Sequence, residues 1–271
     1  MKNAGKQMKM DEKLAEAVKL ANLQKWSRLS HENFEELVNL GTWKDPSHVR
    51  HHIYSRTYGK ILAMCVDVRE KNILDLGCGS GVCTTWLARD GACSFGLDIS
   101  RGMIQVALER ERRQGVECHF VVADIEHLPF HQGAFDFIIS FAALHHVPNP
   151  SYALAEAARV SKQLILYEPN SRSLPHRMVN LYKDIVAKKS GYGGFKRGLI
   201  EVHSSFSPYL LEELLKSIGF TKVKMMPIGF VPWFLGLPLI IVRLLTSLEY
   251  VLENLPVLRW QCGDVLVLAS K

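Results

Sequence analysis

A glycine-rich turn places the strongest constraint on how this chain folds. Residues 72–81 read NILDLGCGSG, an apolar run that leads into a tight turn and then into a helical pattern. Glycine suits such a turn because it adopts positive φ and because a Cβ atom would hold a ligand away from the backbone amides. The glycines are spaced G-x-G-x-G, whereas the nicotinamide dinucleotide fingerprint is G-x-G-x-x-G. The motif therefore predicts a strand, a tight turn and a helix that border a small-molecule site, and its glycine spacing differs from that of nicotinamide dinucleotide sites.

Short apolar runs alternate with helical patterns from residue 71 onward. Strands that alternate with helices indicate a mostly parallel sheet covered by helices on both faces. Ser100 and Ser207 precede two helical stretches as N-cap residues, and Pro208 suits a first helical turn. The chain therefore predicts an α/β fold with a seven-stranded sheet. Its expected strands are Ile73–Leu76, Ser94–Leu97, His119–Val122, Phe135–Ser140, Leu164–Tyr167, Lys222–Met226 and Asp264–Ala269.

The 271 residues suit one large α/β domain with additions. Residues 11–62 read as largely helical, because apolar residues such as Leu14, Val18 and Ala21 recur at spacings of three and four. We therefore predict an N-terminal helical cap over residues 1–62 and a main domain over residues 63–271. The main domain carries a basic segment at 171–206 and a hydrophobic insertion at 228–260, before the last strand.

The motifs from residue 71 onward resemble those of the class I S-adenosylmethionine-dependent methyltransferases. Asp75 precedes the glycine turn, Asp98 ends the second strand, and Asp124 follows the third. Each acid alone is more simply read as a turn or helix cap, but together they form a specific set. The resemblance implies a Rossmann-like fold and S-adenosylmethionine as cofactor, with Asp98 on the ribose hydroxyls and Asp124 near adenine. The implied cofactor-binding residues are Asp75, Gly77, Cys78, Gly79, Gly81, Asp98, Ile99, Met103, Asp124, Ile125 and Phe141.

Residues 135–147, FDFIISFAALHHV, resemble the fourth strand and following loop of the branch that includes the ubiquinone and menaquinone methyltransferases. Base-amine methyltransferases usually carry N/D-P-P-Y where this chain has SFAA, so we expect an oxygen or carbon acceptor. His145 lies just past the fourth strand and is the candidate general base, while Glu168 ends the fifth strand and would orient it. The alternative is that His145 and His146 only pack within the loop and that positioning alone suffices.

A basic segment and an uncharged segment of the sequence bear on the chemical class of the methyl acceptor. Lys and Arg outnumber Asp and Glu by 33 to 27, and residues 172–197 alone hold seven basic side chains against one acid. Residues 225–242 carry no charge, but three prolines and two glycines interrupt them, so we expect no transmembrane helix. Further on, six apolar residues recur at helical spacing, with Arg243, Ser247, Tyr250 and Glu253 on the other side. The six are Ile241, Leu244, Leu245, Leu248, Val251 and Leu252.

These two segments favour a small amphiphilic acceptor, such as a quinone, a lipid-linked sugar or a natural product, and peripheral contact with a membrane. The alternatives are an RNA methyltransferase that uses residues 172–197, a methyltransferase for a soluble metabolite, and an oligomer formed through residues 228–260. Aromatic residues within the basic stretch are sparse, so nucleic acid is the less favoured partner.

The cellular compartment is expected from the N-terminus and the cysteines. The first 20 residues contain no apolar stretch long enough for a secretory signal. The six cysteines show no C-x-x-C pair, so we expect reduced thiols and no metal site. We therefore expect a cytoplasmic protein, with the inner membrane surface as the place of any peripheral contact.

Overall fold

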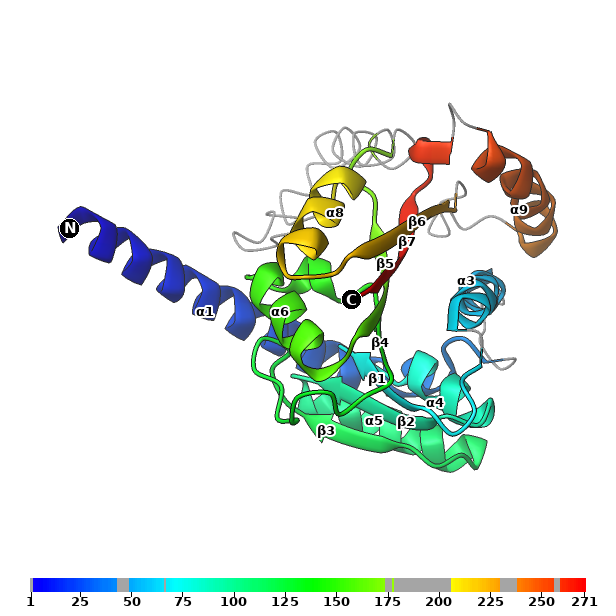
Figure 1. Ribbon diagram of the computed structural model, residues 1–271. Coiled ribbons are helices and arrows are strands. Elements are labelled where there is room, and N and C mark those ends of the chain that lie inside the picture. Colours follow the sequence, from blue (N-terminus) through cyan, green and yellow to red (C-terminus); the bar gives the residue numbers. More distant parts are fainter. Residues whose placement is uncertain are drawn as a thin grey trace, which may run out of the picture.

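A seven-stranded sheet forms the centre of the protein (Figure 1). The computed structural model describes residues 2–42, 49–65, 67–173, 177, 206–229, 238–255 and 259–271. The strand order is β3-β2-β1-β4-β5-β7-β6, and only β7 runs antiparallel to its neighbours. The predicted seven-stranded, mostly parallel sheet is confirmed. The strands are β1 (Asn72–Leu76), β2 (Cys93–Asp98), β3 (His119–Val122), β4 (Phe137–Phe141), β5 (Gln163–Pro169), β6 (Lys222–Ile228) and β7 (Asp264–Ser270).

Helices cover both faces of the sheet, as predicted. On one face, α3 (Val49–Cys65) and α4 (Val82–Arg89) pack on a buried cluster that contains Ile73 and Ile139. On the other face, α6 (Pro150–Val160) and α8 (Pro208–Ser217) pack on a second cluster that contains Leu74 and Ile138. Neighbouring residues of one strand enter opposite clusters because successive side chains of a strand point to opposite faces.

The two predicted N-caps differ in the structure. The Ser100 hydroxyl accepts a hydrogen bond from the backbone N–H of Met103 at 3.3 Å, so it caps α5 (Arg101–Gln114) as expected. Ser207 precedes α8, but its side chain makes no cap hydrogen bond. Pro208 occupies the first turn of α8, where its missing N–H leaves no helix hydrogen bond unmade. The start of α8 is therefore favoured by the fixed φ of Pro208 and not by a hydrogen bond to the Ser207 side chain.

The N-terminal region is helical, in agreement with the sequence. It contains α1 (Lys2–Glu32), α2 (Phe34–Asn39) and α3. The first turns of α1 extend away from the sheet, whereas its C-terminal part packs beside α5 (Figure 1). The boundary predicted at residue 62 falls inside α3, which packs on the sheet. The division into a cap and a main domain therefore stays a prediction.

A fully buried arginine joins the N-terminal region to the glycine turn. Arg110 on α5 donates from Nε to the carbonyl oxygen of Ser80 at 2.7 Å. It also donates to the carbonyl oxygens of Leu37, which accepts in addition from the Leu40 N–H, and of Leu40, the residue directly after α2. One guanidinium thus satisfies carbonyls of two segments far apart in sequence.

Parts of the two predicted additions lie outside the described residues. Of the basic stretch 172–197, only residues 172, 173 and 177 are described. Of the insertion 228–260, the structure describes 228–229, α9 (Leu239–Asn254) with its flanking residues, and the start of η3 (Arg259–Gln261). Within the described chain, no helix combines the length and the apolar character that a membrane crossing requires.

We expect Arg110→Leu to lower the free energy of unfolding by about 3 kcal/mol or more, because each buried carbonyl left without a donor costs about 1 to 3 kcal/mol. Urea denaturation followed by circular dichroism measures the change. Arg112→Leu on the exposed side of α5 is the matched control and should change stability by less than about 1 kcal/mol. Equal losses in the two variants would contradict the role given to Arg110.

Candidate functional site

A cavity of about 620 Å³ lies where the parallel strands end. Open α/β sheets bind ligands at this rim, and the volume suits a ligand of cofactor size with room beside it. Two of the predicted site residues, Gly81 and Glu168, do not line the cavity. Eleven do: Asp75, Gly77, Cys78, Gly79, Asp98, Ile99, Met103, Asp124, Ile125, Phe141 and His145.

The glycine turn is held against two neighbours. Gly77 has φ +72°, and a Cβ atom there would lie 2.5 Å from the Cβ of Ala143, in the loop after β4. Gly81 has φ +74°, and its Cβ would lie 2.9 Å from the Cβ of Ala107 on α5. Only glycine permits both close approaches. Gly81 packs at the start of α4 and does not line the cavity, and its expected part in cofactor binding stays a prediction.

Asp75 presents an unpartnered oxygen at the cavity. Its side chain is buried, and Oδ2 accepts a hydrogen bond from the Thr84 hydroxyl at 2.6 Å. Oδ1 is buried and has no hydrogen-bond partner among the described atoms. Burial raises the pKa of Asp75 to about 7. A buried acceptor without a donor is costly, so this oxygen is suited to a ligand that donates hydrogen bonds and carries positive charge.

Asp98 ties the glycine turn to the end of β2. Its Oδ2 accepts from the backbone N–H of Gly79 at 2.9 Å, and its Oδ1 accepts from that of Ser100 at 2.8 Å. Burial raises the pKa of Asp98 above its usual value. Each carboxylate oxygen has two lone pairs, so both oxygens can accept a further hydrogen bond from a ligand. Asp98 therefore caps the backbone of both segments and keeps lone pairs with which a ligand could be bound.

Helix α1 reaches the third acid, Asp124. The Lys19 ammonium lies 2.7 Å from Asp124 Oδ2 and 2.6 Å from Glu126 Oε2. Partial burial raises the pKa of Asp124, but the hydrogen bonds from Lys19 and from the Glu126 N–H outweigh burial and hold it below its usual value. Lys19, Asn22 and Trp26 of α1 all line the cavity. None of the three was among the predicted site residues, although their spacing of three and four places them on one helix face.

The two predicted catalytic residues meet in the loop after β4. The His145 ring is hydrogen-bonded through Nδ1 to Glu168 Oε2 at 2.8 Å. Glu168 is fully buried behind the cavity wall, and its Oε1 also accepts from the backbone N–H groups of Ala143 and Leu144. His145 lines the cavity with its side chain 12% exposed. This contact fixes the position of the ring, while its role stays a prediction.

His146 lines the cavity beside His145 and makes ring contacts within the protein. Its ring centroid lies 4.0 Å from that of His145 and 5.3 Å from that of Trp26. Its carbonyl oxygen accepts from the Asn22 side chain at 2.7 Å. These contacts join α1 to η1 (Leu144–His146) above the cavity.

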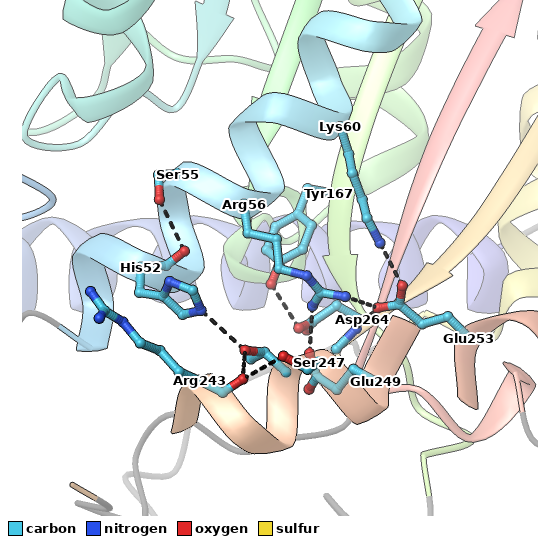
Figure 2. Close-up of polar contacts among 12 residues, drawn as sticks. His52, Ser55, Arg56, Lys60, Tyr167, Arg243, Ser247, Glu249, Glu253 and Asp264 are labelled. Atoms are coloured by element: carbon cyan, nitrogen blue, oxygen red, sulfur yellow. Dashed lines mark hydrogen bonds and ion pairs between the residues drawn. The ribbon is translucent and has the colours of Figure 1, made fainter. Parts of the chain in front are cut away.

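A second titratable pair lines the cavity and was not predicted. The Tyr167 hydroxyl donates to Asp264 Oδ2 at 2.7 Å (Figure 2). The antiparallel register pairs Pro169 with Asp264, so the first residue of β7 lies at the same rim as the last residues of β5. Burial raises the pKa of Asp264 to about 7. No local pattern in the sequence indicates this pair, because it depends on the direction in which β7 joins the sheet.

Residues 74–164 match the family model described as a methyltransferase domain. Methyltransferase GfsG of Streptomyces halstedii is 34% identical over 140 residues, which cover 47% of this chain and 48% of that protein. The ubiquinone biosynthesis O-methyltransferase of Coxiella burnetii is 31% identical over 111 residues, covering 41% and 47%. The chain thus spans about half the length of these curated relatives.

The fold also resembles that of a solved methyltransferase. Magnesium protoporphyrin IX methyltransferase from Synechocystis, crystallised with bound SAH, aligns with a TM-score of 0.58 at 17% identity. The alignment covers 90% of this chain and 96% of that one. At this identity the likeness establishes a shared fold.

We expect Asp264→Asn to remove a pH-dependent loss of stability. Because the folded pKa lies above the ordinary value, the folded state holds its proton longer than the unfolded chain, and stability falls as the pH rises from about 4 to about 7. Relative to the parent, the variant should therefore gain about 2 to 3 kcal/mol between pH 5 and pH 8. Asp75 titrates in both proteins, so the difference isolates Asp264.

Denaturant unfolding at the two pH values measures this difference. Glu70→Gln, which removes an exposed carboxylate, is the control and should follow the parent at both values. A constant difference between Asp264→Asn and the parent across this range would show that Asp264 does not titrate there.

Proposed function

We propose that this chain, which contains a class I S-adenosylmethionine-dependent methyltransferase domain, transfers a methyl group to an oxygen or carbon of an amphiphilic acceptor. The observation that carries this proposal is one cavity lined both by the acids of the cofactor motifs and by the His145 ring that Glu168 holds. The curated relatives are matched over about half their length, so the proposed activity rests on the cavity of this chain and not on the relatives' names.

The acids of the cavity fit the charge of the cofactor. S-adenosylmethionine has a sulfonium, an ammonium and no phosphate, and it supplies a methyl group whose bond to sulfur breaks as the acceptor attacks, leaving the electron pair on sulfur. Asp75 Oδ1 would accept from the ammonium, which supplies its missing partner. Asp98 would accept from the ribose hydroxyls. Asp124 would receive the adenine amino group beside Lys19, which already occupies one of its oxygens.

The acceptor side of the cavity is aromatic. The Phe141 ring lies between Tyr54 and Tyr167, with centroid distances of 5.4 and 4.7 Å. Such a wall favours a planar, apolar group bearing the hydroxyl or acidic carbon to be methylated. This agrees with the relative named for O-methylation in ubiquinone biosynthesis. An amphiphilic aromatic acceptor of the quinone type is therefore the acceptor class that we propose.

His145 would take the proton that leaves the acceptor. With Nδ1–H donated to Glu168, the neutral ring carries its lone pair on Nε2, and that atom can accept a proton from a phenol or enol in the cavity. Glu168 then stabilises the imidazolium that forms. Asp264 with Tyr167 is a second group that could exchange a proton with the acceptor, since both line the cavity.

A polyanionic acceptor such as RNA has less support. Among the described residues that line the cavity, Lys19 is the one lysine or arginine, and Asp124 and Glu126 pair with it. The basic stretch on which the RNA alternative rests lies almost wholly outside the described residues. A cytoplasmic location and the oligomeric state stay predictions.

Cofactor binding is tested by Asp98→Ala. Loss of a charge-assisted hydrogen bond to the ribose should weaken binding about 10- to 150-fold in calorimetry. Since Asp98 also accepts from Gly79 and Ser100, Asp98→Asn is measured beside it, because it keeps an acceptor oxygen and removes the charge. Glu117→Ala, an exposed acid, should leave affinity unchanged. Undiminished binding by both Asp98 variants, or tight binding of a nicotinamide dinucleotide by the parent, would refute the cofactor site.

The acceptor class and the role of His145 are tested together. With methyl-labelled cofactor, we expect the parent to label prenylated phenols or quinols and not RNA. His145→Ala should lower turnover about 10²- to 10⁴-fold while cofactor affinity hardly changes. His146→Ala, which removes a packing ring, should cost only a few fold. A His145→Ala rate within a few fold of the parent would mean that positioning alone drives the reaction, and labelling of RNA alone would overturn the acceptor class.

A further inference from the structure

Helix α9 faces the protein with its polar side and solvent with its apolar side. Its inward positions are Val242, Thr246, Glu249 and Glu253, all less than a tenth exposed. An amphipathic surface helix ordinarily has the opposite orientation. The apolar side chains that point outward, 40 to 69% exposed, are Ile240, Ile241, Leu244, Leu248, Val251 and, directly after the helix, Leu255; we call them the α9 outer face.

Ion pairs with α3 hold this orientation (Figure 2). Arg56 binds both Glu249 and Glu253, and Lys60 Nζ lies 2.6 Å from Glu253 Oε2. His52 Nε2 lies 3.1 Å from the Thr246 hydroxyl. Three successive turns of α3 thus contact α9. Turning the apolar side inward would move the two carboxylates into solvent and place apolar side chains against Arg56 and Lys60. The two largely buried cations would then lack their partners, which is costly.

The same contacts leave the α9 outer face without negative charge. The helix sequence contains three charged residues, Arg243, Glu249 and Glu253. Both acids are inward and paired, whereas Arg243 is exposed. An apolar strip with a cation and no acid is the composition expected of a helix that lies on an anionic lipid surface.

The size of the α9 outer face favours a lipid surface over a second copy of the chain as its binding partner. Sixteen helical residues span about 24 Å, and one helix is about 10 Å wide. The strip consists of six apolar residues, far fewer than the roughly 20 to 30 residues that each partner contributes to a stable protein interface. Interfacial helices, by contrast, bind with a single apolar face that enters about 5 to 10 Å into the headgroup region.

We propose that the α9 outer face docks on an anionic lipid surface. Docking would bring α3 close to the membrane, because α3 lies directly behind α9. Ile53, Tyr54 and Tyr58 on α3 line the cavity, so an amphiphilic molecule leaving the lipid would meet this wall of the cavity. The docking itself does not depend on the reaction that takes place in the cavity.

Vesicle flotation tests the docking. The full chain is mixed with vesicles of phosphatidylcholine alone or of phosphatidylcholine with phosphatidylglycerol in equal parts, at about 50 mM and about 500 mM salt. We expect the parent to float with the anionic vesicles and to float less at high salt. Leu244→Ser with Leu248→Ser should bind at least about 10-fold more weakly, because two leucines lose their apolar contact with the lipid.

The matched control removes two exposed leucines elsewhere. Leu108→Ser with Leu210→Ser changes α5 and α8, whose leucines are 47 and 63% exposed, and should bind vesicles as the parent does. Circular dichroism and thermal unfolding of both double variants show whether they remain folded, whatever the outcome of cofactor binding. Because cofactor affinity and methyl transfer are measured without vesicles, failure of docking is distinguishable from failure of the proposed function.

Three results would overturn the proposal. The parent could remain in the supernatant with both kinds of vesicle, or the α9 double variant could float as well as the parent. Light scattering could instead show a dimer without vesicles that the α9 double variant converts to a monomer, which would make the face an interface between two copies.

Discussion

The hydrogen bonds between the fully buried Glu168 side chain and the loop after β4 are the interactions on which the rest of the site depends. A buried charge is costly unless hydrogen bonds compensate it, and Glu168 receives them from the loop after β4. The loop enters this arrangement through Ala142, which adopts φ +57°, a strained conformation for a residue with a Cβ atom. Its N–H donates to the carbonyl oxygen of Tyr167 at 2.7 Å. These contacts hold the loop in place and fix the position of the His145 ring. They also bring Ala143 so close to Gly77 that a side chain at position 77 would collide with it.

The cavity beside this loop is lined by several acids whose ionised forms are destabilised by burial. Asp75, Asp98 and Asp264 all have raised pKa values, and the folded protein bears the cost of ionising them. A cationic ligand reverses the balance at the acid that it touches, because it stabilises the carboxylate form. Binding of the sulfonium and ammonium of the proposed cofactor would relieve this cost, whereas the negative charge of a phosphate would add to it.

Local patterns in the sequence were sufficient for the sheet and for much of the cofactor side. All seven strands lie where apolar runs were found. The acids near the carboxyl ends of β1, β2 and β3 line one cavity because parallel strands end at one edge. Contacts between distant segments could not be predicted in this way. Lys19 reaches Asp124 only through the packing of α1, and Asp264 reaches Tyr167 only because β7 runs antiparallel. Arg110 gave no signal, since its partners are backbone carbonyls.

Helix α9 shows the limit of periodicity most clearly. The repeat of apolar residues correctly indicates an amphipathic helix, but a periodic pattern is silent on which side faces the core. That choice is made by Arg56 and Lys60, almost two hundred residues earlier in the chain. These cations alternate on α3 with Ile53 and Tyr54, which line the cavity. One helix therefore presents an aromatic wall to the cavity and a cationic row to α9, so the charges that expose the apolar strip also fix the wall against which an acceptor would lie.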